Sequence, residues 1–111
     1  MYVFLANNKF KSTNYDKKVH FSVYEQISSG PKRKYTVIGG ETALQLLQKT
    51  TNVQKKDVGP NAFIIEINGK KAEQSVREYW AFYVNNKLAE VGAGSYQLKP
   101  NDSVLWKVEK Y

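Results

Sequence analysis

The sequence of 111 residues contains no cysteine, one histidine, one methionine and three prolines. Without cysteine there is no disulfide framework, no thiolate nucleophile and no cysteine-based metal site. A zinc or copper centre needs several ligands, and His20 is the single histidine. The composition therefore predicts no metal site.

Long apolar runs are also missing. The first ten residues, MYVFLANNKF, hold only a short apolar run, which is too brief for a signal peptide or a membrane span. We expect no membrane span in this chain. It is then either cytosolic or part of an exported protein whose export segment has been trimmed away.

Groups that could carry catalysis are few. Ser95 in GAGSY lacks the Gly-x-Ser-x-Gly order of a nucleophile turn, and His20 falls on the mixed face of a predicted strand. No pair of carboxylates has a spacing that places both on one rigid face. The scattered carboxylates, at positions typical of solvent-exposed side chains, are Glu66, Glu73, Glu78, Glu90 and Asp102. The sequence therefore predicts a protein that is not an enzyme.

Positive charge dominates, with a formal net charge of +7. The first 58 residues carry ten Lys and Arg against four Asp and Glu, whereas the rest carry seven against six. Single-strand nucleic-acid binders interleave cations with aromatic rings, but here the densest basic run, PKRK, looks like a hairpin loop and lies far from the aromatic run YWAFY. Nucleic acid is therefore an unlikely partner, and weak nucleic-acid binding is the second alternative function.

The first half of the chain predicts a hairpin and a helix. In KKVHFSVYEQ, Val19, Phe21 and Val23 alternate with polar or mixed residues, and YTVI follows after the loop SSGPKRK, so residues 19–38 read as a β-hairpin. The period then changes in GGETALQLLQKTTN. Thr42 and Gln45 have capping-box spacing, and Leu44 and Leu47 follow at helical spacing, which predicts a helix over residues 42–50.

The second half predicts strands joined by tight turns. AFIIEING ends in the turn Asn68-Gly69, and YWAFYVNN ends in the turn Asn85-Asn86. The strand YWAFYV has no polar face, because Tyr79, Ala81 and Tyr83 alternate with Trp80, Phe82 and Val84. A turn at 100–102 leads into a last strand with Val104, Trp106 and Val108 on one face. The fold class is therefore α+β: one domain, residues 1–111, with a mainly antiparallel sheet and one helix packed on it.

The run YWAFYVNNKLAEVGAGSYQLKPNDSVLWKVEKY resembles the C-terminal β-domain of the animal cobalamin carriers, intrinsic factor and transcobalamin. It is similar too to a small domain of many Gram-positive secreted and surface proteins. The shared features are Tyr79-Trp80 before alternating apolar residues, a small-residue loop closing on Tyr96, a polar turn from Pro100 to Asp102, and a last strand with a late aromatic. Upstream, GGETALQLLQKT and FIIEINGK look like the family's helix and the strand and turn that follow it, so the resemblance spans residues 19–111.

The resemblance implies a β-grasp-like sheet, an extracellular or cell-surface location, and a contact surface for a corrin ring. Carried over by position, the ligand-binding residues are Tyr79, Trp80, Val91, Gly92, Ala93, Gly94, Ser95 and Tyr96. We expect the rings at the start of the aromatic strand to join the small-residue loop in a shallow apolar patch. The carriers close their site with a much larger helical domain, which 111 residues cannot contain.

The resulting prediction is a non-enzymatic, exported or cell-surface ligand-binding module. Its candidate ligand is cobalamin, another corrinoid or a different flat small molecule, and its partner a second domain or chain at the cell surface. The first alternative is a structural or adhesive surface domain with no small-molecule ligand. On that alternative the rings of Trp80, Phe82, Tyr96 and Trp106 are simply the core of a small domain.

Overall fold

The computed structural model describes residues 19–56 and 63–111. The short apolar start, residues 1–10, lies outside these ranges, so the expectation drawn from it stays a prediction. The elements in chain order are β1 (His20–Ile27), β2 (Arg33–Ile38), α1 (Ala43–Thr50), β3 (Val53–Lys56), β4 (Phe63–Ile67), β5 (Lys70–Lys71), the 3-10 helix η2 (Gln74–Val76), β6 (Glu78–Val84), β7 (Lys87–Leu88) and β8 (Ser103–Lys110).

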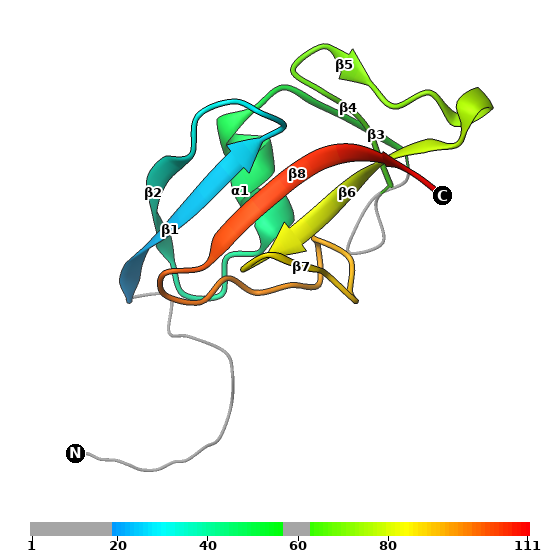
Figure 1. The fold of residues 1–111 in the computed structure, drawn as a ribbon. Helices are drawn as coiled ribbons and strands as arrows, with labels where there is room; N and C mark the ends of the chain where they lie inside the picture. Colours follow the sequence, from blue (N-terminus) through cyan, green and yellow to red (C-terminus); the bar gives the residue numbers. More distant parts are fainter. Residues whose placement is uncertain (1–18, 57–62) are drawn as a thin grey trace.

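The larger sheet has five strands in the order β2-β1-β8-β6-β7 (Figure 1). β1 and β2 form the predicted antiparallel hairpin, and β6 is antiparallel to both β7 and β8. β1 and β8 are parallel, with Tyr24 opposite Ser103 and Ile27 opposite Trp106. The sequence analysis joined neighbouring strands as hairpins and did not predict this pairing. A parallel pair needs a crossover connection, and the one between β1 and β8 includes every other element.

A second, three-stranded sheet has the order β3-β4-β5, and its strand β3 was not predicted. The turn from β4 to β5 has positive φ at Asn68 (50°) and Gly69 (84°), as expected for that dipeptide. The turn after β6 has positive φ at Asn85 (52°) and Asn86 (72°). Both predicted turns are therefore confirmed.

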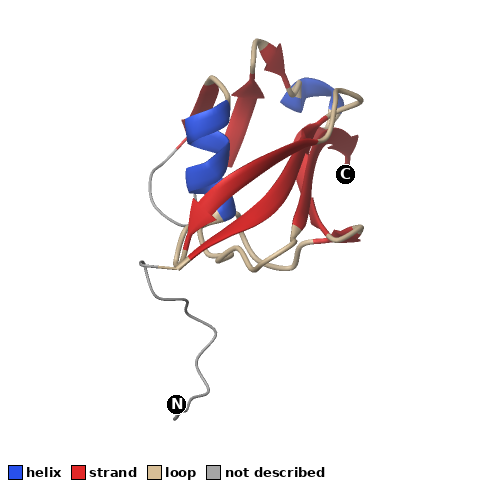
Figure 2. Cartoon of the chain, turned by 90° about the vertical axis from the view of Figure 1, so that its left-hand side faces the viewer, coloured by secondary structure: helices blue, strands red, loops and turns tan. Residues whose placement is uncertain are grey.

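Helix α1 covers one face of the larger sheet, as the side view shows (Figure 2). Its capping box is formed: Gln45 N donates to Thr42 Oγ1 over 3.1 Å, and Thr42 N donates to Gln45 Oε1 over 2.9 Å. Leu44 and Leu47 are buried as predicted, and Leu46 is buried with them. The α+β class is confirmed. No helix in the described ranges is long and apolar enough to cross a membrane.

The aromatic strand β6 sends alternate residues to two different environments. Trp80 and Phe82 point toward the helix and are buried in the core, where the Phe82 and Trp106 rings stack at 5.1 Å. Tyr79 and Tyr83 lie on the other face and are partly exposed. The one α-helix among the described residues lies on the Trp80 side, so the tyrosine face is only partly covered. The two-faced pattern thus reflects one core face and one face with partly exposed rings.

Candidate functional site

The small-residue loop, residues 91–96, is tied to the start of helix α1. Leu44 N donates to the Ala93 carbonyl, and Ala43 N donates to the Tyr96 carbonyl, each over 3.0 Å. The first N–H groups of a helix have no partner within it, and these two find theirs in the loop. The loop also closes on itself, because Ser95 N donates to the Gly92 carbonyl over 2.9 Å. Its backbone is therefore fixed by the helix that it supports.

Tyr96 is held by a buried carboxylate. Its hydroxyl donates to Asp102 Oδ2 over 2.7 Å, and its ring lies edge-on to Phe82 at 6.0 Å. Asp102 also accepts from Lys99 N over 2.9 Å and from Asn85 Nδ2 over 3.0 Å. Asp102 is 4% exposed, so its interpretation as a solvent-exposed carboxylate was wrong. Asp102 is buried because three donors converge on its carboxylate, and which donors reach it depends on the tertiary fold.

A hollow of about 270 Å³ lies between the β6–β7 hairpin and this loop. Leu88 is 52% exposed and Val91 is 51% exposed. The residues that line the hollow are Val84, Lys87, Leu88, Ala89, Glu90, Val91 and Tyr96. The lining is mainly apolar, with Lys87 and Glu90 as its charged members, which suits a ligand with a large apolar surface.

The structure brings together only part of the predicted site. Val91 and Tyr96 line the hollow, and Gly92, Ala93, Gly94 and Ser95 form the loop behind it without lining it. Tyr79 and Trp80 lie near the opposite end of β6, beside the C-terminus (Figure 1). Trp80 is 6% exposed and its Nε1 donates to the Lys70 carbonyl over 3.2 Å. Tyr79 faces the other side of the sheet, where its ring meets Tyr111 at 6.0 Å.

Residues 40–110 match a protein family described as a domain of unknown function (DUF4430). This match covers more than half of the chain. The chain belongs to this family. A comparison with curated proteins gave no match.

Two solved structures share the fold of this DUF4430 domain. Haptocorrin in complex with Cbi has a TM-score of 0.67 at 22% identity, and the match covers 88% of this chain and 27% of the haptocorrin chain. A candidate metal-binding protein from Ruminococcus gnavus ATCC 29149 has a TM-score of 0.63 at 12% identity, covering 83% of this chain and 97% of its own. This chain therefore spans about a quarter of haptocorrin and nearly all of the second protein. At these identities the likeness concerns the fold.

The described part of the chain contains no set of side chains that could bind a metal ion. Over residues 19–56 and 63–111, no group of three His, Cys, Asp or Glu side chains is placed to hold an ion. The buried carboxylates Glu25, Glu41 and Asp102 are instead engaged separately with protein groups.

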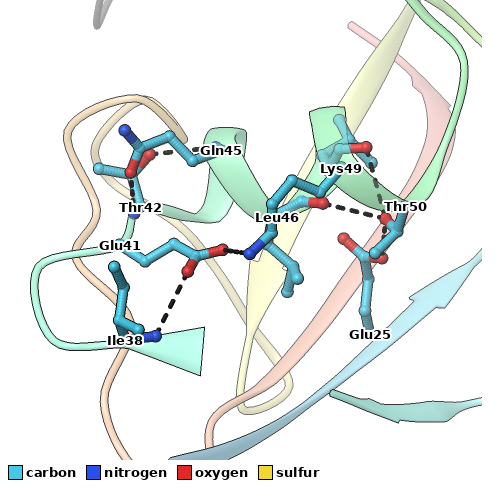
Figure 3. Close-up of polar contacts among 9 residues, drawn as sticks. Glu25, Ile38, Glu41, Thr42, Gln45, Leu46, Lys49 and Thr50 are labelled. Carbon is cyan, nitrogen blue, oxygen red and sulfur yellow. Dashed lines mark hydrogen bonds and ion pairs between the residues drawn. The ribbon is translucent and has the colours of Figure 1, made fainter. Parts of the chain in front are cut away.

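A second hollow, of about 510 Å³, lies beside the start of α1, and sequence analysis did not find it. Its lining includes the glycine pair 39–40 and the side chains of Gln45, Gln48 and Lys49. Glu41, which is 6% exposed, accepts from Ile38 N over 3.3 Å and pairs with Lys49 Nζ at 2.8 Å (Figure 3). Lys49 neutralises this buried carboxylate, which leaves the hollow without a free charge from the pair.

Glu25 is the other buried carboxylate of the helix region, and it lies at the end of α1 (Figure 3). It continues the alternation of Phe21 and Val23 on β1, so the strand pattern extended by one step would have placed it in the core. Thr50 Oγ1 lies 2.6 Å from Glu25 Oε1. Burial raises the pKa of the Glu25 carboxyl, and the hydrogen bond from Thr50 opposes that shift in part.

A polar cluster around Tyr83 lies on the tyrosine face. Tyr83 donates its hydroxyl to Glu109 Oε2 over 2.6 Å, and this hydrogen bond raises the pKa of Tyr83 to about 12. The same bond, together with Lys107 at 3.1 Å, lowers the pKa of the Glu109 carboxyl. Each shift moves the pKa of its group further from pH 7, so Tyr83 stays a phenol and Glu109 stays ionised at pH 7. Neither is suited to exchange protons as a general acid or base.

Proposed function

We propose that this chain is a non-enzymatic ligand-binding module that takes a corrinoid or another flat, largely apolar small molecule in the hollow beside residues 91–96. The observation that carries the proposal is the pair of half-exposed apolar side chains, Leu88 and Val91, beside a tyrosine that is locked in place. Exposed apolar surface next to a rigid frame loses little conformational entropy when a ligand covers it.

The resemblance and the solved haptocorrin structure support the ligand class. Haptocorrin was solved in complex with Cbi, and it shares this fold over 88% of the present chain. The chain spans 27% of haptocorrin, and a hollow of about 270 Å³ encloses a corrinoid only in part. The affinity of the isolated chain should therefore be modest, on the order of micromolar or about −8 kcal/mol, and should rise when a second domain or chain closes the site.

The setting belongs to the same proposal. We assign residues 1–111 to a single domain of β-grasp type, and the central parallel pair of β1 and β8 between two antiparallel pairs, with one helix on one face, supports this assignment. We place the domain outside the cytoplasm, at the surface of a Gram-positive cell, on the strength of the sequence resemblance.

Calorimetric titration of the full chain with cobalamin, cobinamide and haem tests the proposal. We expect heat of binding from at least one of them, with a dissociation constant on the order of micromolar. Leu88→Asp and Val91→Asp should each weaken binding about tenfold or more, because each puts a charge where the apolar ligand lies. Val76→Asp is the matched control: Val76 is 49% exposed on η2, outside the hollow, and its replacement should leave affinity unchanged.

Absence of heat with all three ligands would contradict the proposal. Equal binding by the two hollow variants and by Val76→Asp would place the site elsewhere and would also contradict it. Either result would favour the structural or adhesive surface domain, for which the chain needs no pocket at all.

A further inference from the structure

A cavity of about 290 Å³ lies at the C-terminal end of helix α1, at the opposite end of the helix from residues 91–96. Its walls come from β1, β2, the end of the helix and the β4–β5 turn. The side chains that matter below are Glu25, Arg33, Tyr35, Thr50 and Asn68. Glu25 and Arg33 are the two charged residues in this lining.

Glu25 has an unused acceptor at this wall. The residue is 3% exposed, and its Oε2 is shielded from solvent without a hydrogen-bond partner. Its Oε1 lies 2.6 Å from Thr50 Oγ1, which places the carboxyl group next to another residue of the lining. A buried polar atom with no partner destabilises the folded protein, so a donor that enters the cavity and reaches this oxygen would be favoured.

Thr50 cannot satisfy the carboxylate fully. Its hydroxyl carries one proton, yet it lies within hydrogen-bond distance of Glu25 Oε1, of the Leu46 carbonyl at 3.0 Å and of the Leu47 carbonyl at 3.4 Å. The free carbonyls at a helix C-terminus also carry partial negative charge. Thr51 N and Thr51 Oγ1 donate to the Leu47 carbonyl over 3.0 and 2.6 Å, so the Thr50 proton is shared chiefly between Glu25 Oε1 and the Leu46 carbonyl (Figure 3).

Arg33 supplies the opposite charge in the same lining. It is the cross-strand partner of Glu25 in the β1–β2 hairpin, so both side chains lie on one face. The ion pairs among the described residues are Lys49–Glu41 and Lys107–Glu109, and neither includes Arg33 or Glu25. A simple cation would meet repulsion from Arg33, and a simple anion would meet repulsion from Glu25. A molecule with both charges complements the cavity.

We propose that this cavity binds a small zwitterion, with its ammonium group on Glu25 and its carboxylate on Arg33. A free amino acid has both groups on one carbon and is the simplest member of this class. This site is separate from the hollow beside residues 91–96, so the two proposals stand or fall independently.

Three matched ligands test each charge in turn. Valine has both groups, isobutylamine lacks the carboxylate, and isovalerate lacks the ammonium. Each is titrated into the ¹⁵N-labelled full chain while amide chemical shifts are recorded. We expect valine to bind with a dissociation constant on the order of a millimolar, at least tenfold more tightly than either of the others, with shifts at Ile27, Gly30 and Thr50.

Two variants assign the charges to residues. Glu25→Gln should weaken valine binding at least tenfold, to the level of isovalerate, and Arg33→Gln should weaken it to the level of isobutylamine. The control for Arg33→Gln is Lys34→Gln, next on the same strand and pointing to the other face. The control for Glu25→Gln is Glu73→Gln, an exposed carboxylate outside the cavity. Both controls should bind valine as the wild type does, and well-dispersed spectra show that every variant is folded.

Several outcomes would overturn the proposal. One is that valine causes no saturable shifts, or binds no more tightly than isovalerate. Another is that Glu25→Gln and Lys34→Gln bind valine equally well. A third is that isobutylamine binds strongly to Arg33→Gln but not to the wild type. This result would show that Arg33 forms an ion pair with Glu25 in the free protein.

Discussion

The two ends of helix α1 differ in how completely their polar groups are satisfied. At the first end, Thr42 and Gln45 cap each other, and the loop carbonyls of Ala93 and Tyr96 accept from the helix. At the last end, one threonine hydroxyl faces three acceptors and Glu25 Oε2 has no partner. The first end is built as a frame beside an apolar hollow, whereas the second keeps unused capacity for a donor. The two proposed sites therefore differ in chemistry: the first end borders apolar surface, and the last end offers an unpartnered acceptor.

The largest loss of stability should come from truncating Leu47, which anchors helix α1 to the sheet. Leu47 is completely buried in the core beneath the helix. Leu47→Ala should lower the free energy of unfolding by about 2–5 kcal/mol, because it loses apolar burial and leaves a cavity. Urea unfolding measures this change. A loss below about 1 kcal/mol would mean that the helix does not pack on the sheet as described.

The next largest loss of stability is expected from variants near the start of helix α1. Asp102→Ala leaves Tyr96 Oη, Asn85 Nδ2 and Lys99 N without their acceptor, and should cost about 1–3 kcal/mol of stability. Tyr96→Phe removes a single donor and should cost less than Asp102→Ala, because the ring contact with Phe82 remains. Denaturant midpoints of the two variants give the comparison. Equal costs would mean that the carboxylate does not organise the turn.

A smaller effect of opposite sign is expected at the last end. Burial raises the pKa of Glu25 above its ordinary value of 4.5, so the folded state holds the proton more tightly than the unfolded state does. The stability that Glu25 contributes is therefore fully present below pH 4.5 and is lost as the pH rises through the folded-state pKa. Arg33, its cross-strand neighbour on β2, is the other charged residue that lines the cavity.

Glu25→Gln removes this pH dependence, because the amide does not ionise. The variant should be more stable than the wild type at pH 7, by about 1 kcal/mol as for one unsatisfied buried group, and the two should converge below pH 4.5. Thermal unfolding at several pH values measures the difference. A variant less stable than the wild type at pH 7 would show that Glu25 is ionised and paired.

Local chemistry explains why parts of the fold were predictable from sequence. The Thr42–Gln45 box and the asparagine turns depend on neighbours within a few residues, and both were confirmed. The parallel pairing of Tyr24 with Ser103 joins distant parts of the chain, and no local pattern encodes it. The resemblance named Val91 and Tyr96, which line the hollow, but it did not name Leu88, which also lines it and pairs with Tyr83 across the β6–β7 hairpin.

The burial of polar groups was the least predictable property. Trp80 was proposed as a ligand contact, yet it donates to the Lys70 carbonyl within the core, because β6 packs against the second sheet at that end. Asp102 was interpreted as solvent-exposed, but three donors converge on it. In both cases the partner comes from another segment, and only the assembled fold shows which groups meet.

The central claim is that the hollow beside residues 91–96 binds a flat apolar ligand. Amide chemical shifts of the ¹⁵N-labelled chain, recorded during titration with cobinamide, test it most directly. The account predicts saturable shifts concentrated at residues lining the hollow, Val84, Leu88, Val91 and Tyr96, with Val76 and Arg33 unmoved. Saturable shifts concentrated at Arg33 and Thr50, or no shifts at millimolar cobinamide, would contradict it.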